Sequence, residues 1–192
     1  MEKIFFVTSN EGKVITAKKH VDKVDLIFYK YDLIEPRSES LEEIAKYKVM
    51  QAYKEFGKPC IALDSGFYIE NLNGWPGTFV NFNLENLGLN GILKLLKNNK
   101  NRKAYFKECL AYYDGKEIRY FYGVSSGRIS EKLSKLNHEE QWSKLWRIFI
   151  PDNHDKTMSD MTKEERNNRR DNHTNSFIEF NNYKKSLDKK KF

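Results

Sequence analysis

Lysines and carboxylates in the first third of the chain are the residues whose types and spacing could act on a phosphate group. Thr8-Ser9-Asn10 follows an apolar run and precedes Lys13, so backbone N–H groups and hydroxyls at a helix start could face an anion beside a positive charge. The spacing of a P-loop is absent. On these residues alone, an ordinary turn with a surface lysine is the simpler interpretation.

Glu35 and Asp64 are the candidate metal ligands, because Mg²⁺ prefers one or two carboxylates together with substrate phosphates. Asp64 follows a buried apolar run and precedes Ser65-Gly66, where a carboxylate can project into a cleft and glycine lets a ligand approach. Lys48, four residues after Ile44, should lie near the core-facing edge of a helix. It could contact a phosphate or simply pack its aliphatic stem on the core. Each carboxylate could likewise be an ordinary turn or surface residue.

Strands and helices alternate in the first half of the chain, which favours an α/β or α+β domain with a mixed sheet. Ser40 and Glu43 form a capping-box pattern, and apolar residues at helical spacing follow it through Phe56. Weaker patterns predict strands at 3–8, 24–31, 60–63 and 67–69, a turn at 64–66, a helix through His20 and a loop at 73–77.

The second half of the chain begins with a hairpin signal. Asp114-Gly115 lies between the apolar runs 104–113 and 118–122, as expected for two strands joined by a tight turn. The remaining patterns predict a helix over 91–97 capped by Asn90, a strand at 148–150, a polar helix opened by Thr162 and Glu165, and an exposed loop within 164–175.

The composition fits one globular domain with its own core, at 192 residues and 39% hydrophobic content. A net charge of +7 and a pI of about 9.2 predict a surface that attracts anions. Part of this charge falls in residues 184–192, which we expect to be a solvated basic tail after a domain of residues 1–183. Charge is the only sign of nucleic-acid binding, because no aromatic-basic motif accompanies it, and we expect none.

Cys60 and Cys109 lie in apolar runs and are expected to be buried free thiols, which favours a reducing, cytoplasmic location. No apolar run approaches the ~20 residues that span a bilayer, so we expect no membrane segment. The four histidines show no metal-ligand spacing, which argues against a zinc site.

Taken in order, these pieces resemble the inosine triphosphate pyrophosphatase family, also called the Ham1 family. The resemblance covers residues 3–96, and several spaced motifs in one order are far more specific than any one of them. The matching pieces are Thr8-Ser9-Asn10 with Lys13, Glu35, the helix with Lys48, Asp64-Ser65-Gly66, Gly74-Trp75-Pro76-Gly77 and the strand Ser126-Gly127-Arg128-Ile129.

The resemblance implies a two-lobed α/β fold, with a long mixed β-sheet flanked by helices, a nucleotide cleft between the lobes, and a homodimer. Members hydrolyse inosine, deoxyinosine and xanthosine triphosphates (ITP, dITP and XTP) to the monophosphate and pyrophosphate, with Mg²⁺. By resemblance, Glu35 and Asp64 would bind the metal, and Asp64 and Lys13 would act in catalysis. The nucleotide would be held by Thr8, Ser9, Asn10, Lys13, Lys48, Ser65 and Arg166.

The chain also departs from the family pattern. Leu63 stands where members usually carry an acidic residue before the position of Asp64, and Asn81 replaces a lysine or arginine. Residues 143–147 replace the Phe-Gly-Tyr/Trp-Asp-Pro segment that frames the base. Arg166 can serve as the lysine of the later Lys-Asn-x-x-Ser-His-Arg element, whose Ser-His-Arg is missing. Arg169, Arg170 or His173 could take the place of the missing Ser-His-Arg.

These departures leave a second interpretation open, a catalytically weakened sensor. Such a protein would bind dITP or ITP and signal its occupancy to a partner effector, for example in bacterial antiphage defence. Losing one electrostatic contact in an active site costs ~3 kcal/mol of transition-state stabilisation, so slow turnover would follow from the missing carboxylate. The presence of Lys13, Glu35 and Asp64 favours an enzyme.

Overall fold

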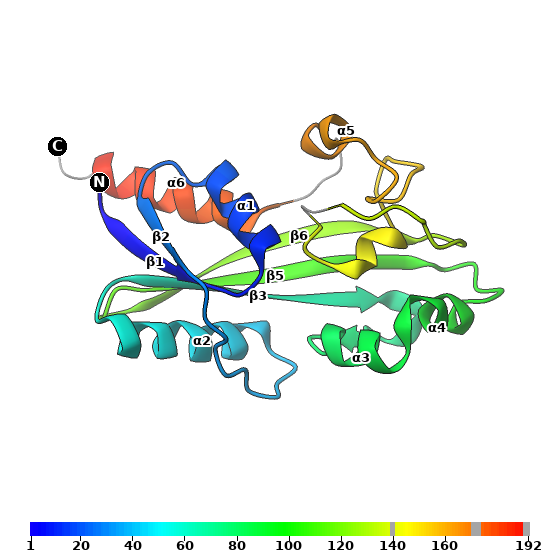
Figure 1. Cartoon of the computed structure of the whole chain (residues 1–192), viewed down its shortest axis with the longest axis horizontal. Helices are drawn as coiled ribbons and strands as arrows, with labels where there is room; N and C mark the ends of the chain where they lie inside the picture. The colour runs from blue at the N-terminus through cyan, green and yellow to red at the C-terminus, as the bar shows by residue number, and fades with distance from the viewer. Residues whose placement is uncertain (139–140, 170–173, 190–192) are drawn as a thin grey trace. The chain divides into compact units, whose positions relative to one another are not determined.

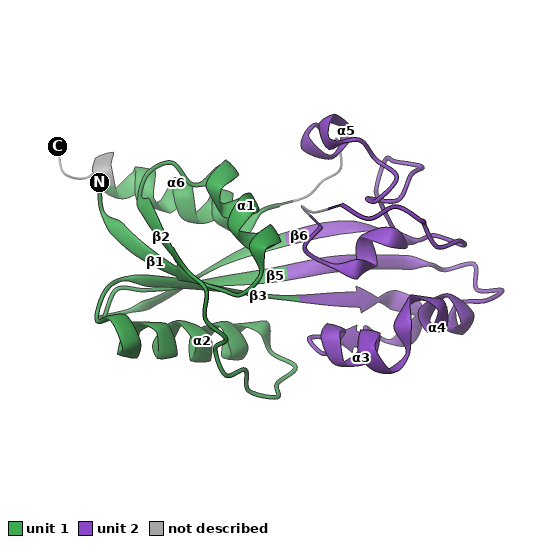
Figure 2. Ribbon diagram, in the orientation of Figure 1, with its two compact units in different colours: residues 1–65, 108–123, 174–192 green, residues 66–107, 124–173 purple. Residues whose placement is uncertain are grey.

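The computed structural model describes residues 1–138, 141–169 and 174–189. The chain divides into two compact units (Figure 2). Unit 1 contains residues 1–65, 108–123 and 174–192, and unit 2 contains residues 66–107 and 124–173. Apart from Arg166, every predicted site residue falls in unit 1.

The described residues form one mixed sheet of seven strands, which confirms the predicted sheet type (Figure 1). The strand order is β2-β1-β3-β5-β6-β7, with β4 beside β3. Strand β1 is parallel to β2 and β3, whereas β4 and β7 pair antiparallel with β3 and β6. The strands are β1 (Lys3–Val7), β2 (Asp25–Tyr29), β3 (Cys60–Ile69), β4 (Pro76–Gly77), β5 (Lys103–Tyr113), β6 (Ile118–Ile129) and β7 (Phe149–Pro151).

Helices cover both faces of the sheet in unit 1 (Figure 1). α1 (Glu11–His20) and α6 (Ser176–Lys189) lie on one face, and α2 (Leu41–Phe56) lies on the other. Phe177 and Phe180 of α6 are fully buried in the core of the first face. The sheet therefore needs apolar side chains on both faces here.

Strand β3 shows how this requirement positions a functional residue. Ile61 and Leu63 belong to the core cluster beneath α1 and α6, whereas Cys60 and Ala62 belong to the cluster beneath α2. Side chains of a strand alternate between faces, so Asp64 follows Cys60 and Ala62 and faces α2.

Helix α2 begins and ends where the sequence predicts, although its cap differs. Ser40 Oγ accepts a hydrogen bond from the Glu43 amide at 3.1 Å, and Gly57 ends the helix with a positive φ of 59°. The reciprocal bond of a capping box was predicted wrongly. Glu43 instead accepts from Ser38 Oγ at 2.6 Å, and the Ser40 amide donates to that same Ser38 Oγ at 3.0 Å.

Unit 2 has its own core, in which the rings of Phe67, Phe106 and Phe149 pack against one another. Thr162 and Glu165 form the predicted capping box at the start of α5. The helix predicted over 91–97 begins earlier, and another helix precedes it. The helical segments of unit 2 are η1 (Glu70–Leu72), α3 (Val80–Asn86), α4 (Gly88–Leu95), η2 (Lys144–Arg147) and α5 (Lys163–Asn167).

Two further expectations require correction. Residues 64–66 form no turn, because β3 continues through them to Ile69. The predicted solvated tail does not begin at Lys184, because α6 runs through Lys189 and the Lys184 side chain is 5% exposed. Two other expectations are confirmed. β5 and β6 flank the predicted turn at Asp114-Gly115, and β6 includes the strand expected at 126–129.

Cys60 and Cys109 are buried free thiols, as predicted. Within the described residues, no helix combines the length and the apolar character needed to cross a membrane. The long mixed sheet flanked by helices agrees with the fold that the family resemblance implies. The cleft expected from that resemblance stays a prediction.

Candidate functional site

The turn after β1 uses the side chains of two predicted site residues to shape the start of α1. Thr8 Oγ1 accepts a hydrogen bond from the Asn10 amide at 3.1 Å, and Asn10 Oδ1 caps the helix by accepting from the Lys13 amide at 3.2 Å. Ser9 lies exposed between them. The turn thus presents a helix N-terminus, where the peptide dipoles favour an anion.

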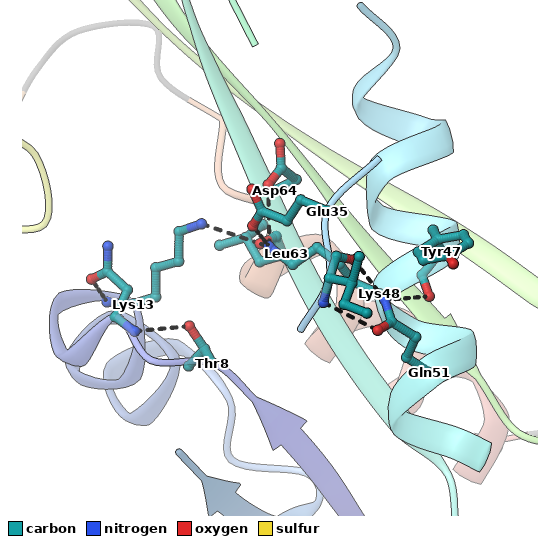
Figure 3. A network of polar contacts seen from close by, with 10 residues as sticks. Thr8, Lys13, Glu35, Tyr47, Lys48, Gln51, Leu63 and Asp64 are labelled. Atoms are coloured by element: carbon teal, nitrogen blue, oxygen red, sulfur yellow. Dashed lines mark hydrogen bonds and ion pairs between the residues drawn. The ribbon is translucent and has the colours of Figure 1, made fainter. Parts of the chain in front are cut away.

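Lys13 reaches from α1 to the middle of strand β3. Its Nζ donates to the Leu63 carbonyl oxygen at 3.1 Å (Figure 3). Burial lowers the pKa of Lys13, and the nearby Lys48 ammonium lowers it further, whereas the Asp64 and Glu35 carboxylates act in the opposite direction. Burial is therefore the main reason why the charged form of Lys13 is disfavoured.

Lys48 approaches the same carbonyl from α2, on the other face of the sheet. Its Nζ lies 2.6 Å from Glu35 Oε1, 3.2 Å from Asp64 Oδ1 and 3.4 Å from the Leu63 carbonyl oxygen (Figure 3). The residue is 8% exposed, so it is neither a surface lysine nor a purely packing one. Burial acts to lower the pKa of Lys48, but the two carboxylates outweigh it and the pKa is raised.

Asp64 is the buried carboxylate of the group, with 7% of its surface exposed. Burial raises the pKa of Asp64, and the Lys13 and Lys48 ammonium groups oppose this shift only in part. Since Asp64 sits inside β3, a rigid backbone fixes its position. Ser65 follows in the same strand, and alternation directs its side chain to the opposite face from Asp64.

Glu35 belongs to residues 30–40, which connect β2 to α2 without regular secondary structure. Its side chain is 55% exposed and meets Lys48 Nζ at 2.6 Å. Pro36 restricts the backbone of Glu35 to extended conformations. The two candidate metal ligands therefore differ, one buried on a strand and the other exposed on a connecting segment.

Glu35 and Asp64 are the residues of this group that could hold Mg²⁺. Among the described residues, no group of three or more His, Cys, Asp or Glu side chains could hold a metal ion. Glu35 and Asp64 nevertheless share one ammonium group, so two carboxylates point at a common position. Two carboxylates completed by substrate phosphates are a set that Mg²⁺ accepts. Leu63 contributes its carbonyl to the lysines, while its side chain packs in the core.

Arg166 lies in unit 2, where its side chain holds the surrounding chain. Nη1 donates to the carbonyls of Met158 and Met161, and the guanidinium lies 5.7 Å from the centre of the Trp146 ring. Arg169 Nη2, in the same unit, donates to Ser125 Oγ at 2.7 Å. Arg170 and His173, the other suggested substitutes, lie outside the described residues.

Sequence reasoning missed Gln51. Its amide Oε1 accepts from the Ile34 N–H at 3.1 Å, and its Nε2 donates to the Ile34 carbonyl at 2.6 Å. The available signal was its position three residues after Lys48, which places both side chains on neighbouring parts of one helix surface. Its partner, an extended segment of no clear pattern, gave no signal.

Comparisons with known proteins show which family the chain resembles. The model of the Ham1 family matches residues 4–176. A dITP/XTP pyrophosphatase from Thermococcus kodakarensis is 36% identical over 167 residues, covering 86% of this chain and 88% of that protein. One from Saccharolobus solfataricus is 38% identical over 167 residues, covering 86% and 85%.

Solved structures show the same fold. The Ham1 protein of Staphylococcus aureus superposes with a TM-score of 0.74 at 26% identity, covering 97% of this chain and 99% of that one. A HAM1 protein from Coxiella burnetii gives a TM-score of 0.76 at 22% identity, covering 98% and 100%.

Proposed function

The chain belongs to the Ham1 family, and from this premise we propose that it hydrolyses purine nucleoside triphosphates to the monophosphate and pyrophosphate. The proposed substrates are dITP and XTP, which the relatives' names specify, together with ITP. One observation carries the proposal. Two ammonium groups and two carboxylates converge around the Leu63 carbonyl within unit 1.

The lysines are proposed to hold the triphosphate. Lys13 and Lys48 bring two positive charges to one place, and an incoming polyanion would relieve the repulsion between them. Thr8, Ser9 and Asn10 place the N-terminus of α1 beside this position, where backbone amides suit a phosphate. Ser65 and Arg166 are proposed as further nucleotide contacts.

The carboxylates are proposed to serve the metal and the water. Glu35 and Asp64 would hold Mg²⁺, which when bound neutralises charge on the phosphate oxygens. Asp64 would also accept a proton from the water whose oxygen attacks phosphorus, while the bond between the α- and β-phosphates breaks and pyrophosphate leaves.

The test is product analysis with binding measured in parallel. The protein is incubated with dITP, ITP or XTP and Mg²⁺, with dATP and dGTP as controls, and pyrophosphate and monophosphate are quantified. Calorimetry with the same nucleotides and no metal gives the affinity. Equal amounts of both products from dITP, ITP or XTP support the proposal. Tight binding without products contradicts an enzyme, and absence of binding contradicts the site.

A second candidate function is a nucleotide sensor. The observation in its favour is that Lys48 occupies the position between Glu35 and Asp64, while Leu63 provides no third carboxylate. Binding without products in the experiment above would support it. The sensor would then act on a partner effector, as in bacterial antiphage defence, and copurification with neighbouring gene products would test that step. For both candidate functions we propose a homodimer and a cytoplasmic location. Light scattering of the purified protein measures its oligomeric state.

A further inference from the structure

The segment that carries Glu35 is held to α2 by polar contacts more than by burial. Residues 30–40 contain no helix or strand. Leu33 packs against the core beneath α2, but Ile34 is 70% exposed. Apolar packing therefore ends at Leu33. The orientation of the peptide that leads into Glu35 depends on hydrogen bonds instead.

Gln51 makes those hydrogen bonds at both ends of one residue. Its Oε1 accepts from the Ile34 N–H at 3.1 Å, and its Nε2 donates to the Ile34 carbonyl at 2.6 Å. Nε2 also lies 3.4 Å from the Tyr47 carbonyl, one turn earlier in α2 (Figure 3). A single amide that pairs with both backbone groups of Ile34 fixes its position and its rotation, as a strand partner would.

The contacts along the segment follow a regular order. Ile34 meets Gln51, Glu35 meets Lys48, and Ser38 meets Glu43. As the residue number rises in the segment it falls in α2, so the segment runs antiparallel to the helix. The Glu35 carboxylate is thus flanked by one anchor on each side, at Ile34 and at Ser38.

We propose that Gln51 is a positioning residue for Glu35: through the backbone of Ile34 it holds the exposed carboxylate beside Lys48 and Asp64, ready to receive the metal. This inference rests on the proposed function for its catalytic consequence. The structural part does not depend on it. Because the Glu35 side chain is 55% exposed, water and side-chain entropy compete for it, and a fixed backbone reduces what must be ordered when metal and nucleotide bind.

Two variants remove the contact in different ways. Gln51→Ala deletes the amide, and Gln51→Met keeps the length of the side chain but can neither donate nor accept in the same manner. Gln51 is only partly buried and methionine has a high helix propensity, so Gln51→Met should fold. It therefore tests the lost hydrogen bonds even if Gln51→Ala folds poorly. Met50→Ala, at an exposed neighbouring position of α2, is the matched control.

The first readout needs no nucleotide. Hydrogen exchange followed by mass spectrometry, on the metal-free protein, reports peptides covering residues 30–40. Both Gln51 variants are expected to raise exchange in these peptides at least about fivefold, with α2 and β3 peptides unchanged, because the lost bonds stabilise the segment alone. Unchanged exchange in residues 30–40 would overturn the inference at its structural step, whatever the activity.

The second readout is the Mg²⁺ concentration for half-maximal pyrophosphate release from dITP. Each Gln51 variant is expected to raise it about tenfold, with little change in KM for nucleotide at saturating Mg²⁺. A merely structural loss would lower activity equally at every Mg²⁺ concentration. Calorimetric titration of Mg²⁺ into protein that holds the α,β-imido analogue of dITP, whose α–β linkage resists cleavage, compares the Mg²⁺ affinities of the variants and wild type without turnover.

A double-mutant cycle with Glu35→Gln completes the test. If Gln51 acts through Glu35, Gln51→Met on the Glu35→Gln background adds no further change in Mg²⁺ requirement. Additive effects would overturn the inference. Should the wild-type protein bind no nucleotide and release no pyrophosphate, the proposed function and the catalytic role of Gln51 both fail. Hydrogen exchange still decides in that case whether Gln51 holds the segment.

Discussion

The ammonium groups of Lys13 and Lys48 donate to one carbonyl oxygen, that of Leu63, at 3.1 and 3.4 Å. The two lysines come from helices on opposite faces of the sheet. Burial and the repulsion from Lys48 lower the pKa of Lys13, so this proximity opposes the charged state of Lys13. A polyanionic ligand, as in the proposed function, would reverse that effect.

Replacing Lys13 should weaken nucleotide binding without harming the fold. Lys13→Ala removes one charge from the triphosphate, and we expect the Kd for dITP, measured by calorimetry without metal, to rise at least about tenfold. The melting temperature should stay the same or rise, because a partly desolvated ammonium is lost. Lys19→Ala, at an exposed position of the same helix, is the control. Equal affinity of Lys13→Ala and wild type would show that the phosphates bind elsewhere.

Lys184 should contribute to stability although it lies in a run of charged residues. Its Nζ donates to Glu2 Oε2 and to the Tyr112 hydroxyl, both at 2.9 Å, and lies 4.1 Å from the centre of the Tyr112 ring. We expect Lys184→Met to lower the free energy of unfolding by about 2 kcal/mol, because it removes a buried ammonium group's hydrogen bond to Tyr112, its ion pair with Glu2 and its contact with the Tyr112 ring.

The neighbouring residue provides the control for this measurement. Lys185 is 42% exposed and lies 3.9 Å from Asp22, so Lys185→Met should change the free energy of unfolding by less than about 0.5 kcal/mol. Urea unfolding measures both variants. Equal effects of the two substitutions would mean that α6 is not anchored through Lys184.

The Asp114 turn should make stability depend on pH in the acid range. Burial acts to raise the pKa of Asp114, but the amides of Glu117 and Lys116, which donate to it at 3.1 and 2.9 Å, outweigh burial and hold the pKa below its usual value. A lowered folded pKa stabilises the protein above the unfolded value of ~3.9, and this stabilisation is lost as pH falls through the folded pKa.

Asp114→Asn isolates the effect of this charge, because asparagine keeps an acceptor oxygen but does not titrate. Urea unfolding should show the variant less stable than wild type at pH 7, and the difference should shrink near pH 3. A difference in the free energy of unfolding that is the same at both pH values would rule out the charge as its source.

The two cysteines should react only after unfolding. Cys60 and Cys109 are both 0% exposed, and burial raises the pKa of the Cys60 thiol to about 12. The native protein at pH 8 should therefore take up no iodoacetamide within minutes, whereas the protein in guanidinium should take up two equivalents, one for each cysteine. Rapid labelling of Cys60 in the native protein, detected by mass spectrometry, would contradict the packing beneath α2.

Local signals were sufficient to predict several elements. Ser40 and the apolar spacing that follows it define α2, because a cap and an amphipathic face are both local properties. Asp114-Gly115 defines the turn between β5 and β6 for the same reason. The predicted helix α2 places Lys48 near the core, where the structure has it. Residue type singled out the lysines and carboxylates of the candidate site, and only a family resemblance assigned them their expected roles.

The failures occurred where tertiary contacts override local preference. Asp64-Ser65-Gly66 has the composition of a turn, yet burial of β3 on both faces and its pairing with β4 at Phe67 and Tyr68 keep the strand extended. The C-terminal helix α6 was missed because charged residues obscure its apolar positions, of which Phe177 and Phe180 are fully buried. The position of Gln51 three residues after Lys48 was the one local signal, and it did not reveal the contact with Ile34, which is seventeen residues away in a segment without pattern.

In the proposed function, the Lys13 turn and the Asp64 strand form one site for a nucleoside triphosphate. A crystal structure of the Asp64→Asn variant with dITP and Mg²⁺ tests it most directly, because this variant should hold uncleaved nucleotide. We expect triphosphate oxygens within hydrogen-bonding distance of both Lys13 Nζ and Lys48 Nζ, with the metal at Glu35. A triphosphate bound away from these two lysines, or bound with both still directed only at the Leu63 carbonyl, would contradict it.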